Sequence, residues 1–562
     1  MSRRSESQPP HRSEPAWSAC PGVPAGPVAG GRDKDQGPER ACREIPCPGN
    51  AFVVRVRLVR GRVDEAWSTG RMLRNANVLL RGELDDQGQP RFAQQAHCLC
   101  NDGHALAAVR ALEALAGVTP PRPARLVRSL VQACRCIQEH LLHVYHFHLS
   151  DWAGRETALR ADPAAAARLT TQLTDPLADH PDENAAYFRR AQDRLRALAR
   201  EPGAEAPAPD GHPDLRGPDE LHLVFRAHAL DSLRTGAELT AALDLLGCGP
   251  DGFKPYCLGG PPEDLDLGAE VRRQLGERLR RCRAFIDQTF LPDLTRLARA
   301  HAHWAHIGAG RAFLSCDDFL LPGEDAPLFP GGLVVPAPGA GGETGGSAWR
   351  ALRADGPVRE EAEPRWSPAD RDRYRLRPDG RGPGFRWGQG EFAWLPAPRL
   401  GREAGDDASE PDFEACEAGP LARVLGAWVR GREPVRRVVR RTLDACGLGP
   451  AALNSTLGRV LARGMEASVL AEAALAWLDE LDPSDGPDPA RAPGRAAVRL
   501  PSSGQGTGRV EVPRGMLTHT IRLEDRRIAA HDYRIPTLWN FSPRDSHGRR
   551  GPLEQALLGT PV

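Results

Sequence analysis

The sequence has no excess of either charge and no long hydrophobic run. Its 562 residues include 74 Lys and Arg against 74 Asp and Glu, so the formal net charge is zero. Proteins that bind nucleic acid or an anionic membrane through charge need a surplus of Lys and Arg, so both classes are disfavoured. No segment reaches the roughly eighteen apolar residues of a membrane span, and no apolar stretch follows Arg3 and Arg4. We therefore expect a cytoplasmic protein without a membrane span.

A regular cysteine framework is also missing. The 13 cysteines are an odd number with irregular spacing, which disfavours a small secreted domain held by disulfides and indicates a reducing compartment. Gly and Pro are abundant instead, with 58 and 52 residues. Because both residues favour turns and interrupt regular structure, a large part of the chain is expected to be loop or linker.

Composition divides the chain unevenly. Residues 1–45 are rich in Pro, Ser, Gly and charged residues and have almost no apolar periodicity, which predicts a disordered tail. Residues 46–562 are expected to form one domain. Gly- and Pro-rich stretches predict loop-rich insertions in it near 201–218, 322–412 and 483–508.

Apolar periodicity predicts a mainly α fold with small β elements at both ends, an α+β class. Val54, Val56 and Leu58 alternate with arginines before a turn, as in a hairpin with one wet face. Helical spacing predicts two helices between 104 and 149, divided by a pair of prolines, and further helices over 221–246, 270–306 and 421–477. Residues 509–512 and 518–522 again alternate like strands.

Metal-capable side chains gather most densely around His97, Cys98 and Cys100, just before His104 begins a helical pattern. Thiolates and imidazoles suit nickel, iron, zinc or copper, so the segment is a candidate metal-binding loop. Two partly buried thiols beside a helix-capping loop would give the same spacing. The pattern does not distinguish this structural arrangement from a metal-binding loop. A second group, His140 and His143, is more typical of packed, hydrogen-bonded helix residues than of metal ligands.

Several segments together resemble the large subunit of nickel–iron hydrogenases. They are AWSTGRMLR (66–74), Cys100 with HALAAVRALE (104–113), HLLHVY (140–145) with Asp151 and Trp152, FAWLPAPR (392–399), GPLAR (419–423), STLGR (455–459), PRGMLTH (513–519) and PTLWNFSPRD (536–545). They stand in the family's order and extend the similarity from about Phe52 to Val562. The resemblance implies a long helical bundle around a metal centre and a surface for an iron–sulfur small subunit.

The resemblance also implies four cysteines that hold nickel and bridge it to an iron with cyanide and carbon monoxide ligands. Cys100 matches the second cysteine of the first pair, while the first falls on His97 and Cys98 is one place out of register. The second pair has no counterpart, because the last cysteine is Cys446. Asn77 stands where the family has a glutamate that binds magnesium. Because too few cysteines match the family's four, we expect iron with cyanide and carbon monoxide as the candidate cofactor, and nickel is doubtful.

The residues that surround the metals in the family are better matched. Arg514 corresponds to the guanidinium that hangs over the metal pair, and Thr537, after Pro536, to the hydroxyl that binds a cyanide. Fixed donors of this kind suit a cyanide nitrogen, whereas an ordinary salt bridge and a strand-end hydroxyl are the alternatives.

The sequence favours a maturation scaffold that transiently holds the iron–cyanide–carbonyl unit, with maturation chaperones or a hydrogenase small subunit as partners. One alternative is a hydrogenase large subunit that oxidises dihydrogen, with its C-terminal cysteine motif missing or supplied separately and Arg514 as a candidate catalytic group. Another is a metal-free interaction partner.

Overall fold

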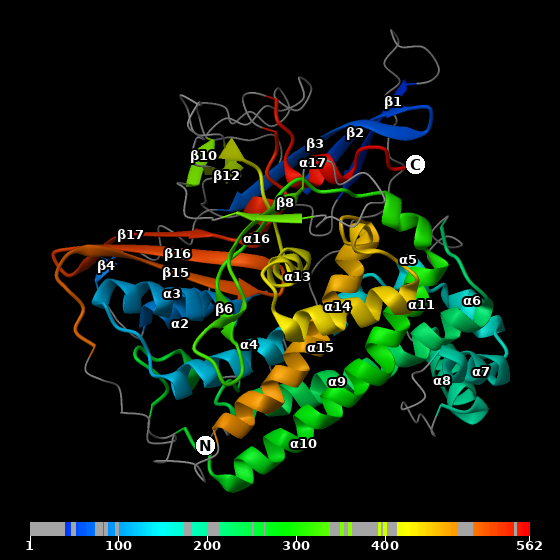
Figure 1. The fold of residues 1–562 in the computed structure, drawn as a ribbon, viewed down its shortest axis with the longest axis horizontal. Coiled ribbons are helices and arrows are strands. Elements are labelled where there is room, and N and C mark those ends of the chain that lie inside the picture. The colour runs from blue at the N-terminus through cyan, green and yellow to red at the C-terminus, as the bar shows by residue number, and fades with distance from the viewer. Residues whose placement is uncertain are drawn as a thin grey trace, which may run out of the picture.

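The computed structural model describes residues 40–46, 52–73, 82–83, 88–95, 100–173, 183–200, 214–249, 252–262, 265–337, 349–352, 358–361, 392–394, 397–401, 413–481, 498–544 and 548–562. Helices predominate, and several small sheets lie around them (Figure 1). The described part contains no helix with the length and apolar character needed to span a bilayer.

The helical elements occupy most of the middle of the chain. They are α2 (Gly88–Gln95), α3 (Asn101–Ala116), α4 (Arg122–Leu142), η1 (His143–Phe147), α5 (Leu149–Trp152), α6 (Arg155–Arg160), α7 (Pro163–Leu173), α8 (Ala185–Leu198), α9 (Asp219–Leu245), η2 (Lys254–Tyr256), α10 (Ala269–Phe285), η3 (Ile286–Phe290), α11 (Leu291–Ala300), η4 (Ala302–His306), α13 (Pro420–Val429), α14 (Glu433–Cys446), η5 (Pro450–Leu453), α15 (Thr456–Glu480), α16 (Pro536–Asn540) and α17 (Pro552–Ala556).

The strands are short except at the two ends of the chain. They are β1 (Arg40–Pro46), β2 (Phe52–Val59), β3 (Arg62–Leu73), β4 (Gly82–Glu83), β5 (Phe313–Ser315), β6 (Asp318–Leu320), β7 (Pro327–Phe329), β8 (Gly332–Pro336), β9 (Trp349–Leu352), β10 (Val358–Glu361), β11 (Phe392–Trp394), β12 (Ala397–Gly401), β13 (Phe413–Glu414), β14 (Glu417–Ala418), β15 (Gly504–Val512), β16 (Gly515–Glu524) and β17 (Arg527–Arg534).

Helix α15 lies at the centre of the helical body. The hydroxyl of Ser455 caps its first turn by accepting from Gly458 N, and residues 464–471 are buried on every side of the helix. A helix that is buried all round needs neighbours on all sides. Helices α4, α10, α11, α13 and α14 supply them.

A four-stranded sheet of order β15-β16-β17-β4 covers helix α3 (Figure 1). The sheet approaches α3 closely at Gly508, where an added Cβ would lie 2.1 Å from the carbonyl oxygen of Ala107. Since only glycine has no Cβ, this residue is needed for the contact. The contact places the β15–β16 turn near the start of α3.

The two ends of the described chain meet at the β2–β3 hairpin (Figure 1). Val63 N donates to Thr560 O over 2.9 Å, and Gly559 N donates to Val63 O over 2.8 Å. On the other side of the hairpin, β1 pairs antiparallel with β2, so paired backbone begins at Arg40, inside the segment predicted as a tail. Extended backbone pairs there because β2 offers an open edge, which composition alone does not reveal.

The predicted helices and the small strands at both ends are confirmed, and the structure adds strands in the middle of the chain that the sequence did not predict. The sheet β14-β5-β8-β9, the sheet β10-β12-β13 and the pair β6-β7 lie in the middle of the chain. Strands of two to five residues carry too little alternation to be recognised among Gly and Pro. Their pairing is decided by distant segments, as where Glu417 pairs in parallel with Phe313.

Candidate functional site

Cys100 stands at the start of helix α3, as the residue that precedes its first turn. Its carbonyl oxygen accepts the first helical hydrogen bond, from His104 N at 3.0 Å, and its side chain is half-buried. Arg514 Nη1 donates to Cys100 Sγ over 3.7 Å. A cationic donor beside a sulfur stabilises negative charge on it. Cys100 and Arg514, which the sequence assigned to one site, are therefore in contact.

Arg514 is held by a carboxylate on another helix. It lies in the turn between β15 and β16, and its Nη2 donates to Glu139 of α4 at 2.8 Å to Oε2 and 3.3 Å to Oε1. The two side chains are 32% and 20% exposed, so the ion pair lies at the edge of the interior. Because Glu139 binds one nitrogen and the sulfur faces the other, the guanidinium is fixed in direction.

A buried ion network positions the turn that carries Arg514. Arg423 of α13 pairs with Glu466 of α15 and with Glu511 at the end of β15, and all three side chains are fully buried. His140 of α4 joins this network through Nε2, 2.9 Å from Glu466 Oε2. Burial opposes ionisation of Glu466, but Arg423 and His140 outweigh it and lower the pKa of this carboxyl to about 2. The ion pairs of Arg423 therefore tie α13 and α15 to β15, and the hydrogen bond of His140 joins α4 to them.

Pro536 and Thr537 begin α16, the short helix that follows β17. Asn540 connects this helix to the arginine turn: its Nδ2 donates to Arg514 O over 3.5 Å, and its Oδ1 accepts from Ala418 N at 2.8 Å. Pro536 is buried and Thr537 half-buried. The structure thus brings α16 beside the Arg514 turn, while a role for Thr537 in binding a ligand stays a prediction.

The structure does not test the other predicted donors. His97, Cys98 and Asn77 lie outside the described residues. In the part of the chain that is described, no group of three or more His, Cys, Asp or Glu side chains is placed to hold a metal ion. Burial raises the pKa of Cys134 to about 12 and that of Cys446 to about 11, so these thiols stay protonated at neutral pH. The described residues alone therefore do not fit a nickel–iron pair.

The histidines after Glu139 are packed, as the sequence favoured. His140 is bound to Glu466, and the ring of His143 lies against that of His148 with centroids 4.4 Å apart. Burial strongly lowers the pKa of His143. These rings stabilise the junction of α4 and η1.

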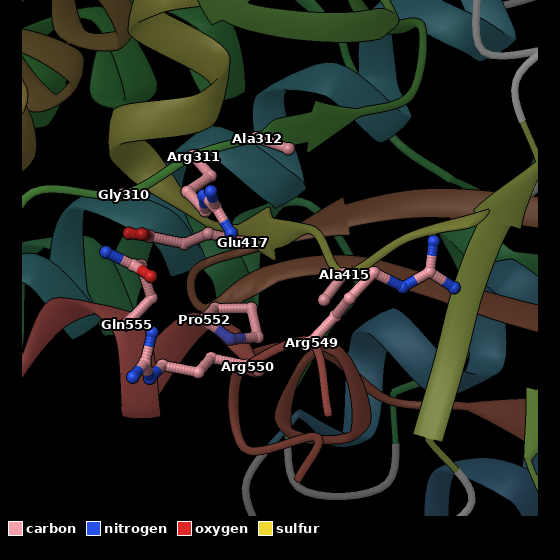
Figure 2. Close-up of a pocket in the computed structure, with 10 residues that line it drawn as sticks. Gly310, Arg311, Ala312, Ala415, Glu417, Arg549, Arg550, Pro552 and Gln555 are labelled. Atoms are coloured by element: carbon pink, nitrogen blue, oxygen red, sulfur yellow. The ribbon is translucent and has the colours of Figure 1, made fainter. Parts of the chain in front are cut away.

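A small cavity of about 30 Å³ lies away from Cys100, between the segments before β5 and β14 and the start of α17 (Figure 2). Its lining includes three arginines, but Figure 2 shows Arg549 pointing away from Arg550. Glu417, also in the lining, is already paired with Arg459 at 2.7 Å. The space suits about one water molecule, and the charges do not converge on a ligand.

Sequence reasoning did not identify Glu466 and Glu511 as part of the site. Arg423 lay inside one of the recognised segments, but its partners are 43 and 88 residues away. A glutamate in an apolar helix and another in a strand end give a weak signal of burial. Only the folded chain shows that they share one guanidinium.

The fold and the site define a helix-rich protein in which a helix-capping cysteine faces an arginine held by a carboxylate. The family model for nickel-dependent hydrogenase matches residues 74–562. The uptake hydrogenase large subunit of Rhodobacter capsulatus is 29% identical over 539 residues, covering 89% of this chain and 87% of the relative. That of Azotobacter chroococcum mcd 1 is 30% identical over 551 residues, covering 89% and 86%.

Solved structures show the same fold. A [NiFeSe] hydrogenase variant from Desulfovibrio vulgaris Hildenborough superposes with a TM-score of 0.66 at 22% identity, over 93% of this chain and 94% of the other. The chain belongs to the nickel-dependent hydrogenase family. The resemblance found in the sequence is thereby confirmed. The family match does not support the expectation that nickel is doubtful. That expectation rested on counting the thiols in the sequence.

Proposed function

We propose that this chain is the large subunit of a nickel-dependent hydrogenase, which oxidises dihydrogen together with an iron–sulfur small subunit. The names of its relatives support this proposal, since two uptake hydrogenase large subunits match nearly nine-tenths of the chain. The observation that carries it is the contact of Arg514 with Cys100, supported by Glu139. A metal pair would need donors beyond the described residues, so no reaction step is assigned to it.

A maturation scaffold is the second candidate. It would hold the iron–cyanide–carbonyl unit for a time and pass it on with the help of maturation chaperones. It is favoured by the contact of Arg514 with one half-buried thiol, Cys100, and by the lack of a three-donor group in the described ranges. Few strong ligands would suit temporary holding, because full thiolate chelation slows release.

Metal analysis separates the two candidates. The full-length chain, co-expressed with a hydrogenase small subunit and purified without oxygen, is assayed for nickel and iron, for infrared bands of cyanide and carbon monoxide, and for dye-linked dihydrogen uptake. Nickel with dihydrogen uptake is expected. Iron with both infrared bands but no nickel would overturn the first proposal in favour of the scaffold. Absence of both metals would overturn both and leave the metal-free interaction partner.

Substitutions then locate the site. His97→Ala and Cys100→Ala are each expected to abolish iron loading, because each removes a predicted donor. Cys446→Ala is the matched control, since Cys446 is another half-buried thiol and its pKa is raised by burial. Unchanged iron content in both His97→Ala and Cys100→Ala would remove this loop from the metal site.

A further inference from the structure

Helix α8 has one buried face and one exposed face that is rich in arginine. Its buried side chains, Phe188, Ala191, Gln192 and Leu195, pack toward α7 and α9. At 3.6 residues per turn, the other side of the helix and the turn that follows it carry five exposed arginines. We call them the arginine face: Arg189, Arg190, Arg194, Arg196 and Arg200.

Four of these five arginines have no carboxylate partner. Arg196 pairs with Asp193 at 2.8 Å. The other side chains make no hydrogen bond or ion pair with any residue that the structure describes: Arg189, Arg190, Arg194 and Arg200. Arg190 and Arg194 are four positions apart, and like charges at this spacing repel each other on a helix. The face therefore carries positive charge that the described part of the chain does not neutralise.

A second arginine-rich helix shows a different balance. Helix α14 has 14 residues, as α8 has, and its arginines at 437, 440 and 441 are also exposed. Each of them has a carboxylate within 2.6 to 3.9 Å: Arg437 pairs with Glu472, Arg440 with Glu433 and Arg441 with Asp287. Exposure and arginine content are thus similar in the two helices, and only α8 lacks the matching carboxylates.

Unpaired guanidinium groups suit an anionic partner, and the pattern of the face favours separate carboxylates over a lipid surface. Asp193 lies within the face and its side chain is 67% exposed, so a continuous anionic plane would also meet a negative charge. Carboxylates on a flexible segment can pass beside Asp193 and bind guanidinium groups through two hydrogen bonds each. We propose that the arginine face of α8 binds an acidic segment of a partner protein.

The dimensions of the face suit a short segment. Arg189 and Arg200 are eleven positions apart, which is about 17 Å along a helix axis, so about five residues of extended chain would follow the face. Figure 1 shows α8 at the outer edge of the helical body, well away from α3. The face therefore lies apart from the contact of Cys100 with Arg514, and the inference goes beyond the proposed function.

Fluorescence anisotropy tests the inference, with labelled hexaglutamate as the probe and the full-length chain at low ionic strength. The parent should bind the peptide, and binding should be lost at about 1 M salt, where the Debye length is about 3 Å. Replacing Arg189, Arg190 and Arg194 together with glutamine should weaken binding roughly tenfold or more, because three exposed ion pairs are lost. Glutamine has a helix propensity close to that of arginine, so circular dichroism should confirm an unchanged fold.

Replacing Arg437, Arg440 and Arg441 in α14 with glutamine is the matched control. It removes the same number of charges, but from arginines that already have partners, so the affinity for hexaglutamate should stay at the parent value. The inference is overturned if the parent does not bind the peptide, or if both triple variants weaken binding equally.

Vesicles of phosphatidylserine and phosphatidylcholine test the other anionic surface by sedimentation. The parent chain should stay in solution. If it sediments with the vesicles and the α8 variant does not, α8 binds lipid and the inference is overturned. None of these measurements involves nickel, iron or dihydrogen uptake, so any outcome leaves the proposed function standing.

Discussion

Replacing Arg423 with leucine tests whether one buried guanidinium holds the turn that carries Arg514. The Arg423 side chain is fully buried, as are its partners Glu466 and Glu511. It also donates to Val512 O at 3.0 Å, directly before the turn. Removing it leaves two carboxylates without their cation in a medium that solvates charge poorly. Breaking a buried pair from one side costs about 3–5 kcal/mol, so Arg423→Leu should lower the free energy of unfolding by that amount.

Urea unfolding at neutral pH, followed by tryptophan fluorescence, measures the change against the parent protein. Arg437→Leu is the matched control, because its pair with Glu472 is exposed, at 55% and 38% for the two side chains. Exposed pairs contribute about 0–1 kcal/mol, so the control should stay close to the parent. If Arg423→Leu also stays within about 1 kcal/mol of the parent, the buried network does not hold the turn.

A combined variant separates charge from packing. Adding Glu466→Gln and Glu511→Gln to Arg423→Leu removes both stranded charges while nearly keeping the shapes of the side chains. Part of the lost stability should return, because uncompensated charge causes most of the cost. No recovery would mean that lost packing, and not charge, dominates at Arg423.

Three further predictions concern other parts of the fold. Burial raises the pKa of Glu554 to about 7 from 4.5, so the folded state holds more protons than the unfolded state between these pH values. The free energy of unfolding should therefore fall as pH rises from 4.5 to 7. Glu554→Gln should flatten this slope in urea titrations at several pH values. Burial opposes protonation of His228, but Asp293 and Glu183 raise its pKa to about 10 from 6.5. Its contribution to stability should therefore be complete below pH 6.5 and be lost as pH rises toward 10, and a pH-independent difference between the parent and His228→Gln would contradict this. Gly508→Ala should destabilise the protein by about 1–3 kcal/mol, because the new Cβ meets the carbonyl oxygen of Ala107. Gly236→Ala in α9 is the control, since open space surrounds this glycine. In the same unfolding assay it should stabilise the protein by up to about 1 kcal/mol.

The sequence predicted the long elements well because their periodicity is local. The helical spacing over 104–149 appears as α3 and α4, and the alternation over 509–522 appears as β15 and β16. The short middle strands could not be predicted, because a strand such as Phe313–Ser315 is defined by its partners and not by its own pattern. Sequence similarity also brought Cys100 and Arg514 into one site.

By itself, then, the sequence determined the family, the main helices and the two residues that mark the site, since each is a property of residue order or of neighbours along the chain. The tertiary structure decided the rest. It chose Glu139 as the partner of Arg514, placed Arg423 between two glutamates and aligned His519 with His104 and His531. These choices join residues from 12 to 415 positions apart. No local pattern encodes them, because they depend on which helix and strand surfaces meet when the core closes.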